Sequence, residues 1–160
     1  MKPNEDAPEG ARDEDILVRN LNKDDLERVI RIDKANTGLD RRNFMTERAD
    51  SALEESGMRV SLGAEVDGNL VGFMLSSVHH GEYGRPAPVA AIDTIGVDPA
   101  FRGKGIGRAL MAQLVRNLQA LRVEKLETLV AWDEADLMSF LRASGFAPAA
   151  RLCLEMPLEG

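Results

Sequence analysis

A short run of the sequence combines positive side chains with glycines. It reads Arg102, Gly103, Lys104, Gly105, Ile106, Gly107 and Arg108. Glycine allows positive φ angles and lets a ligand approach the backbone closely. Apolar residues then recur at helical spacing as far as Leu121, so the run predicts the start of a helix, where unpaired N–H groups and the positive end of the helix dipole attract anions. We therefore expect a binding site for phosphate groups; the alternative is a tight structural turn whose cations are only solvated.

The residues before this run predict the strand that leads into it. Residues 89–97 are mostly apolar, small or β-branched, and Asp98-Pro99 ends the strand. Side chains of a strand alternate between its two faces, which puts Asp93 on the same face as Val97. Asp93 is the one charged residue of the predicted strand. A strand, a turn, a glycine-rich loop and a helix therefore follow one another without interruption.

Other ligand classes fit the sequence less well. A Walker A loop ends in Gly-Lys-Ser or Gly-Lys-Thr, which residues 102–108 lack, and the dinucleotide fingerprint needs G-x-G-x-x-G with an acidic residue after the next strand. A single cysteine excludes an internal disulfide. Together with two adjacent histidines it does not have the spacing of a zinc site, so we expect no metal.

The glycine loop resembles the acyl-CoA loop of the GNAT-type N-acetyltransferases. The family signature is Arg or Gln, two residues, Gly, one residue, and Gly or Ala, which matches Arg102, Gly105 and Gly107. The similarity extends upstream to Val-Asp-Pro at residues 97–99 and downstream to SFLRASGF at residues 139–146. It implies a mixed, three-layer α/β fold with a central, mostly antiparallel sheet. It also implies an enzyme that uses acetyl-CoA as co-substrate.

The resemblance further implies how that co-substrate lies. In the family, the strand that corresponds to residues 89–97 and the next strand separate at their C-terminal ends. The pantetheine arm lies in the gap and bonds to backbone groups near Ile95 and Val97, while the pyrophosphate lies on the loop, here residues 102–108. The two opening helices and their connection border the acceptor amine, which makes residues 36–44 a candidate for acceptor selection.

Acetyl transfer to a lysine-like amine benefits from a general base. Asp93 is our candidate, acting directly or through a water, because family members often carry a carboxylate on this strand; the alternative is a carboxylate held by a neighbouring arginine or by backbone donors. Glu82 and His80 are weaker candidates. Many family members have a tyrosine that is thought to protonate the leaving thiolate, but Leu141 occupies the matching position here. Tyr83, in the neighbouring loop, is the candidate replacement.

The remaining elements follow from periodicity and from helix-capping residues. Expected strands cover residues 16–19, 59–66, 70–78, 125–131 and 149–156, and expected helices cover about 22–36, 40–57 and 133–143. The expected N-caps are Asn22, Asp40 and Asp133, and the expected C-terminal glycines are Gly57 and Gly145. A hairpin signal at residues 67–69 makes the sheet at least partly antiparallel.

Composition bounds the class of protein. The chain has 160 residues, of which 44% are hydrophobic and 29% charged, which suits one globular domain over residues 15–160. Residues 1–14 are acidic and polar and are expected to be disordered. The net charge of −7 disfavours a nucleic-acid or membrane partner. Neither a signal peptide nor an apolar span of about 18 residues is present, which predicts a cytoplasmic protein.

Three functions remain open at this point. The first is transfer of an acetyl group from acetyl-CoA to a primary amine, in a small molecule or in a protein lysine or N-terminus. The second is an acyl-CoA-binding regulatory or interaction module with little or no turnover, which the leucine at position 141 favours. The third is a nucleotide-binding protein that uses the same loop and binds ATP or NAD more tightly than CoA. A homodimer is frequent in the family and is therefore a further expectation.

Overall fold

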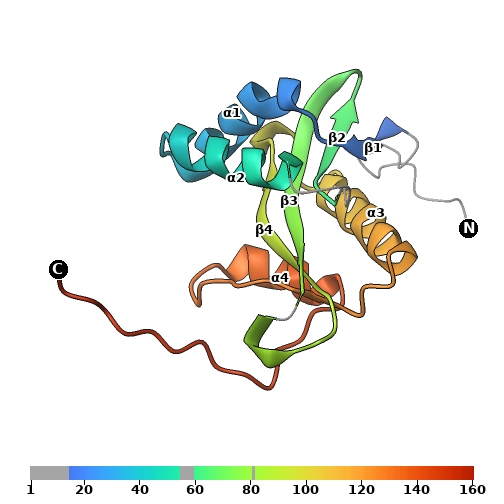
Figure 1. Ribbon diagram of the computed structural model, residues 1–160. Helices are drawn as coiled ribbons and strands as arrows, with labels where there is room; N and C mark the ends of the chain where they lie inside the picture. The colour runs from blue at the N-terminus through green and yellow to red at the C-terminus, as the bar shows by residue number, and fades with distance from the viewer. Residues whose placement is uncertain (1–14, 55–59, 81) are drawn as a thin grey trace, which may run out of the picture. The chain divides into compact units, whose positions relative to one another are not determined.

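A computed structural model describes residues 15–54, 60–80 and 82–160 (Figure 1). The chain divides into two compact units, one ending at Leu129 and the other covering Val130–Gly160. The first unit contains the sheet and the helices α1, α2 and α3, and the second contains the helix α4. The predicted acidic tail and the expected C-terminal glycine, Gly57, lie outside the described residues.

The first unit is built on a five-stranded sheet whose strands lie in chain order. The strands are β1 (Leu17–Asn20), β2 (Leu62–Val66), β3 (Asn69–His79), β4 (Val89–Val97) and β5 (Lys125–Glu127). Neighbouring strands are antiparallel from β1 to β4, and β5 runs parallel to β4. The mixed, mostly antiparallel sheet that the resemblance implied is therefore confirmed, as is the hairpin that the sequence predicted between β2 and β3.

Helices cover both faces of this sheet, which gives three layers. They are α1 (Leu26–Thr37), α2 (Arg42–Glu54) and α3 (Ile106–Ala120). Phe73 of β3 belongs to the core cluster that includes Ile32 of α1 and Met45 of α2. A Cβ on the preceding residue, Gly72, would instead lie 2.6 Å from the side chain of Ile106 in α3. Successive strand residues point to opposite faces, so α1 and α2 lie on one face and α3 on the other.

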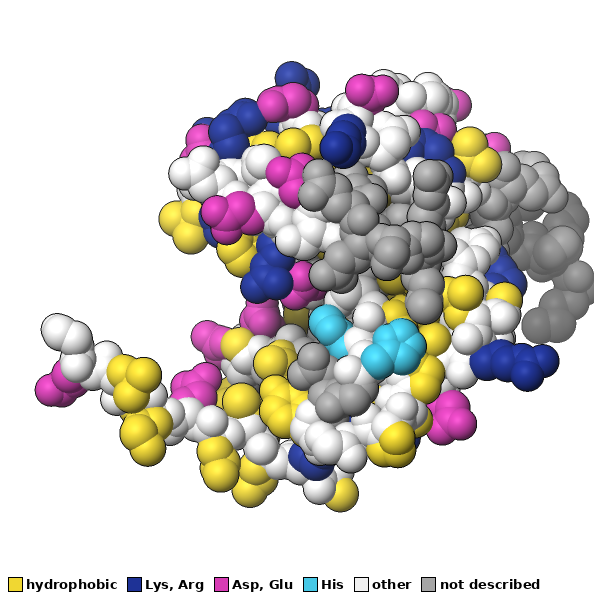
Figure 2. Space-filling view, in the orientation of Figure 1, with side chains coloured by type: hydrophobic (Ala, Val, Ile, Leu, Met, Phe, Trp, Pro, Cys, Tyr) yellow, Lys and Arg dark blue, Asp and Glu magenta, His cyan; other side chains and the backbone are white. Residues whose placement is uncertain are grey.

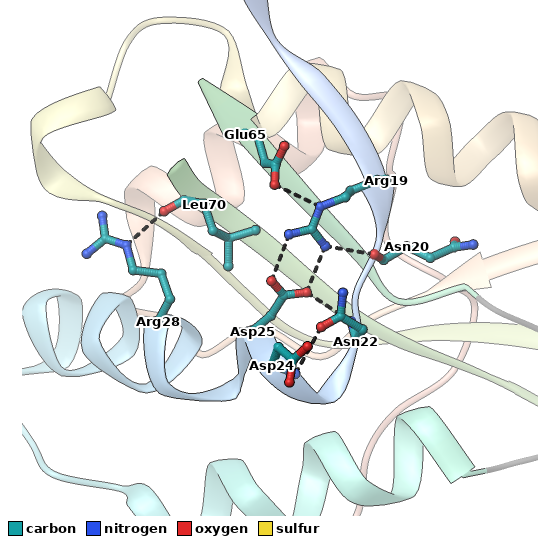
Figure 3. Close-up of polar contacts among 8 residues, drawn as sticks. All are labelled: Arg19, Asn20, Asn22, Asp24, Asp25, Arg28, Glu65 and Leu70. Atoms are coloured by element: carbon teal, nitrogen blue, oxygen red, sulfur yellow. Dashed lines mark hydrogen bonds and ion pairs between the residues drawn. The ribbon is translucent and has the colours of Figure 1, made fainter. Parts of the chain in front are cut away.

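The start of α1 is tied to the sheet by the first strand (Figure 3). The Arg19 guanidinium donates to both carboxylate oxygens of Asp25 at 2.7 Å and to Glu65 of β2 at 2.9 Å. Asn22 caps the turn as predicted, and its backbone N–H donates to Asp25 in return. Burial by itself raises the pKa of Asp25, but these hydrogen bonds and the Arg19 charge outweigh it and hold the pKa below its ordinary value. The capped turn thus fixes where α1 begins.

The sequence prediction is less accurate in the C-terminal part. The strand expected over residues 125–131 forms only as β5, and α4 (Ala135–Ala143) follows Glu134 without a side-chain cap, so Asp133 is not its N-cap. Gly145 does have the expected positive φ, of 100°. The strand expected over residues 149–156 is wrong, because residues 147–160 form neither helix nor strand. A strand needs a backbone partner, and none of the described strands pairs with this segment.

Candidate active site

The turn at the C-terminal end of β4 is held by side chains from distant elements. The Asp98 carboxylate accepts a hydrogen bond from the N–H of Ala100 at 3.0 Å and another from Arg28 of α1 at 2.6 Å. Arg28 also donates to the carbonyl of Leu70, at the start of β3, at 2.8 Å. One arginine of α1 therefore joins the ends of two strands and fixes the point from which the glycine loop departs.

The glycine loop leads directly into α3 as the sequence predicted. Gly103 and Gly105 have left-handed φ angles of 74° and 84°, which a side chain would strain. Gly105 is the N-cap of α3, and within the described part of the chain no side chain caps this helix. The first turn thus presents backbone N–H groups that have no helical acceptor. Gly107 differs from our expectation, because it lies inside α3 and does not have a positive φ.

The first turn of α3 packs closely on the backbone of β3. A Cβ at Gly72 would lie 2.6 Å from Cγ2 of Ile106 and 3.3 Å from Cδ1 of Leu110. The missing side chain therefore lets the helix approach the sheet where β4 ends. Ile106 and Leu110 are both buried, which fixes the direction of the uncapped helix start.

The cations of the loop are exposed, and Arg102 is also anchored. Its guanidinium donates to the side-chain oxygen of Asn36, near the C-terminal end of α1. The Asn36 amide nitrogen in turn donates to the backbone carbonyl of Val97 at 3.0 Å. Lys104 lies over the ring of Phe101, 5.0 Å from its centroid. Asn36 therefore links the glycine loop, the end of β4 and the segment that we expected to border the acceptor.

One edge of β4 lacks a strand partner over its C-terminal half. β5 pairs with Val89, Ala90 and Ala91, and the hydroxyl of Thr128 donates to the carbonyl of Ile92 at 3.1 Å. Beyond Ile92, none of the described strands pairs with this edge. The ladder stops where the resemblance implies that the two strands separate. An extended ligand that carries amide groups can bond to such an edge as a further strand does.

A β-bulge lies at Asp93, the candidate general base. Leu75 pairs with Thr94 and the next residue of β3, Ser76, pairs with Ile92, so Asp93 has no partner opposite it. The bulge interrupts the simple alternation. The Asp93 carboxylate reaches Arg48 of α2, whereas Val97 pairs with Gly72, which faces α3. Our expectation that Asp93 and Val97 share a face is therefore wrong, because the extra residue re-aims the strand.

Two arginines on the α2 side are paired with carboxylates of the protein. Arg48 contacts Asp93 at 3.3 Å, and both side chains are exposed to solvent. Arg41 donates twice to the buried carboxylate of Asp33, with the longer bond at 3.0 Å. The ring of Phe44, which is 40% exposed, lies near both arginines, with its centroid 5.0 Å from the Arg41 guanidinium and 5.4 Å from that of Arg48. Arg48 is thus a neighbouring arginine of the kind expected in the alternative role for Asp93.

The loop before β4 keeps the other catalytic candidates away from the core. Tyr83 is 91% exposed, has a positive φ of 51°, and lies 5.8 Å from the guanidinium of Arg85, which pairs with Glu127 of β5. Within the described residues no hydrogen bond joins Tyr83 to Asp93. His80 is exposed, and the side chain of the other weak candidate, Glu82, lies outside the described residues. Leu141 is buried in the second unit.

The described residues hold neither a candidate metal site nor a candidate membrane-spanning helix. Among the described residues, no group of three or more histidine, cysteine, aspartate or glutamate side chains is arranged to hold a metal ion. In the same part of the chain no helix is both long enough and apolar enough to span a membrane.

Comparison with known proteins gives one family. The sequence model of the acetyltransferase (GNAT) family matches residues 24–146. The mycothiol acetyltransferase of Nocardia farcinica is 30% identical over 115 residues, which cover 70% of this chain and 36% of that protein. The mycothiol acetyltransferase of Propionibacterium freudenreichii is 29% identical over 150 residues, which cover 88% of this chain and 44% of that protein. The chain therefore spans less than half the length of these two relatives.

Solved structures show the same fold. An aminoglycoside N-acetyltransferase, AAC(6')-Iy, in complex with CoA has a TM-score of 0.76 and 21% identity, with 94% of this chain and 98% of that chain covered. A ribosomal-protein-alanine N-acetyltransferase from Brucella melitensis has a TM-score of 0.70 and 24% identity, with 90% and 99% covered. At these identities the likeness establishes the fold and leaves the acceptor open.

Proposed function

The chain belongs to the acetyltransferase (GNAT) family, and from this premise we propose that it transfers the acetyl group of acetyl-CoA to a primary amine by direct attack. One observation carries the proposal: an uncapped helix start follows a strand edge that no described strand pairs with. Both present unpaired backbone groups, which are what a ligand with a pyrophosphate and an amide-bearing arm can use. The relatives named for mycothiol and aminoglycoside acetylation make amine transfer the expected chemistry.

The donor half of the proposed site is made mostly of backbone groups. The N–H groups of Ile106, Gly107 and Arg108 would bind the pyrophosphate, with Arg102 and Lys104 adding charge. Backbone groups near Ile95 and Val97 would hold the pantetheine arm along the edge of β4 that no described strand occupies. The residues present therefore fit acetyl-CoA as co-substrate, and proximity would supply much of the rate.

The reaction needs a proton acceptor near the thioester. The amine nitrogen bonds to the acetyl carbon, the carbon–sulfur bond breaks, and the amine proton passes to Asp93 directly or through a water. The leaving thiolate takes up a proton. By analogy with a thiol pKa near 8.5, expelling the thiolate at pH 7 is only about 2 kcal/mol uphill, so turnover without a dedicated acid is feasible. Tyr83 is our candidate for this acid.

The type of amine decides how much the base matters. A lysine-like amine with a pKa of about 10.4 costs roughly 4.6 kcal/mol to present unprotonated at pH 7, and an α-amine with a pKa near 7.8 costs roughly 1 kcal/mol. A general base contributes about 10² to 10⁴ in rate. We propose a small-molecule amine, or a protein lysine or N-terminus, as the acceptor, and a cytoplasmic location that cell fractionation can check.

Replacing Asp93 tests the proposed base. We expect Asp93→Asn to lower kcat about 100-fold or more at pH 7 with a lysine-like amine, and much less with an α-amine. The deficit should shrink as the pH rises, because the amine then loses its proton without help. The measurement is steady-state acetyl transfer over a range of about pH 6 to 10 with a panel of amines, together with the Kd for acetyl-CoA, which should not change.

Asp67→Asn makes the same chemical change in the turn between β2 and β3 and is the matched control. If Asp93→Asn keeps kcat within about threefold for every amine, Asp93 is not the base. If the wild-type protein binds acetyl-CoA tightly and acetylates none of the amines, the alternative holds: an acyl-CoA-binding module with little turnover. The ion pair between Asp93 and Arg48 is the observation that favours this second function.

A further inference from the structure

Arg48 lies beside the proposed general base and has hydrogen-bonding capacity left over. Its Nη1 donates to Oδ2 of Asp93 at 3.3 Å, and the two side chains are 49% and 40% exposed. A guanidinium has five N–H donors, and a carboxylate accepts with both oxygens. Among the described residues, the other nitrogens of Arg48 and Oδ1 of Asp93 have no hydrogen-bond partner. The pair therefore leaves donors of one residue and an acceptor of the other for a ligand.

Phe44 limits where the Arg48 guanidinium lies. The centroid of its ring is 5.4 Å from that guanidinium, a distance at which the face of an aromatic ring attracts a cation. Arg41 lies near the same ring, but its guanidinium donates to both carboxylate oxygens of the buried Asp33. Of these two arginines, Arg48 is the one that can bind an anionic group of a ligand next to Asp93.

The charges near Asp93 do not suit an acceptor with several positive charges. Asp93 is the one charged residue of β4, and its partner is an arginine. In residues 36–44, Asp40 is the one acid and stands beside Arg41 and Arg42 in the sequence. On the face drawn in Figure 2, basic and acidic side chains lie interspersed over α1 and α2. A site for a polycation would instead gather carboxylates, because complementary charge selects the ligand.

We propose that the acceptor carries a carboxylate next to its primary amine, as an α-amino acid does, an inference that rests on the proposed amine acetylation. Arg48 binds the carboxylate, and Asp93 faces the amine. Both groups of an α-amino acid are attached to one carbon, so they can contact two opposite charges that lie side by side. A simple cationic amine has to displace Arg48 from Asp93, whereas the zwitterion gives Arg48 a new partner. The bonds made and broken are those given above, and the products are the N-acetyl amino acid, with its carboxylate unchanged, and CoA.

The test compares acetyl transfer to amino acids with transfer to amines that lack only the carboxylate. The pairs are alanine with ethylamine, leucine with isopentylamine, and phenylalanine with phenethylamine. We expect kcat/KM to be at least about tenfold higher for the amino acid in one pair or more. Arg48→Gln should lower kcat/KM for that amino acid about 10- to 100-fold, mainly through KM, and should not lower it for the paired amine.

Two further variants show whether the charge and its position matter. Arg48→Lys keeps the positive charge without the planar fork of donors and should restore part of the lost kcat/KM. Arg116→Gln is the matched control, because it removes an exposed charge from α3, on the other face of the sheet. It should change kcat/KM for neither member of a pair. The Kd for acetyl-CoA should be the same in all variants, which checks that each of them is folded.

The possible failures separate this inference from the proposed function. If the amines, or an aminoglycoside, are acetylated as well as the amino acids or better, the carboxylate is not recognised, and acetyl transfer to an amine still stands. If Arg48→Gln lowers kcat/KM equally for both members of each pair, Arg48 acts on Asp93 and not on a carboxylate. If the protein binds acetyl-CoA and acetylates none of these compounds, the proposed function fails and this inference fails with it.

Discussion

The two halves of the candidate site differ in whether their polar groups have partners within the protein. The donor half is the end of β4 with the start of α3, and the acceptor half is the surface along α2. On the donor half, at the end of β4, α3 begins without a side-chain cap and the strand edge beyond Ile92 has no described strand partner. On the acceptor half, on and beside α2, three arginines are paired with carboxylates of the protein. They are Arg41 with Asp33, Arg42 with Glu27 and Arg48 with Asp93.

This difference indicates what each half has to do when a ligand arrives. Unpaired backbone groups are costly unless a partner satisfies them, and they keep one geometry because the chain fixes them. The donor half is therefore preformed. In the proposed reaction, an acceptor amine would instead have to compete with Arg48 for Asp93, at the modest cost typical of an exposed ion pair. We infer that the donor half determines co-substrate affinity and the acceptor half tunes which amine is used.

The largest expected effect comes from Gly105. A valine there would have to adopt a φ of 84°, which costs about 1–3 kcal/mol and displaces the N–H groups of the first turn of α3. We expect Gly105→Val to weaken acetyl-CoA binding at least about 100-fold in calorimetric titration. ATP and NAD should bind the wild-type protein less tightly than acetyl-CoA does.

Gly68→Val is the matched control for this change. Gly68 has a similar φ of 76° in the turn between β2 and β3, and a Cβ there meets no atom within 4 Å. The control should lower stability and leave acetyl-CoA binding intact. Equal loss of binding in both variants would show that strain alone explains the result, and the preformed donor half would then lose its support.

Arg102 should have a smaller effect on the same half. The guanidinium is exposed and already donates a hydrogen bond to Asn36, so only part of its hydrogen-bonding capacity remains for a bound phosphate. We expect Arg102→Ala to weaken acetyl-CoA binding about tenfold and to reduce its dependence on salt concentration. The measurement is a set of titrations between low and high salt. An unchanged salt dependence would mean that Arg102 only anchors the loop.

The strand end, the turn and the helix start of the proposed donor half were the parts that the sequence could predict. Their information is local: Gly105 precedes the helix that Ile106 starts, and Asp98-Pro99 ends the strand. The links made by Asn36 could not be predicted, because its partners Val97 and Arg102 lie more than 60 residues away in the sequence. No pattern within β4 signals the bulge either, since it is a mismatch in register with β3.

The same distinction explains the C-terminal error. The period of two in residues 149–156 is a real strand pattern, but a pattern states only what a segment needs and does not supply its partner. β4, in contrast, was predicted with its observed bounds, because β3 pairs with it along nearly its whole length. Strand prediction from sequence therefore succeeds here where the partner lies nearby in the same chain.

The smallest expected effect, on the acceptor half, concerns Arg48. If the amine competes with Arg48 for Asp93, Arg48→Gln should lower the KM for a cationic amine about two- to fivefold, the range that an exposed ion pair of up to about 1 kcal/mol allows. The Kd for acetyl-CoA should stay the same.

Arg42→Gln is the matched control. It removes a charge from the same helix, where the guanidinium pairs with Glu27 instead. Equal changes in KM for both variants would mean that the loss of any positive charge on α2 explains the effect, whichever carboxylate the arginine pairs with. A rise in KM with Arg48→Gln alone would mean that Arg48 orients Asp93 and does not compete for it, so that both halves of the site would be preformed.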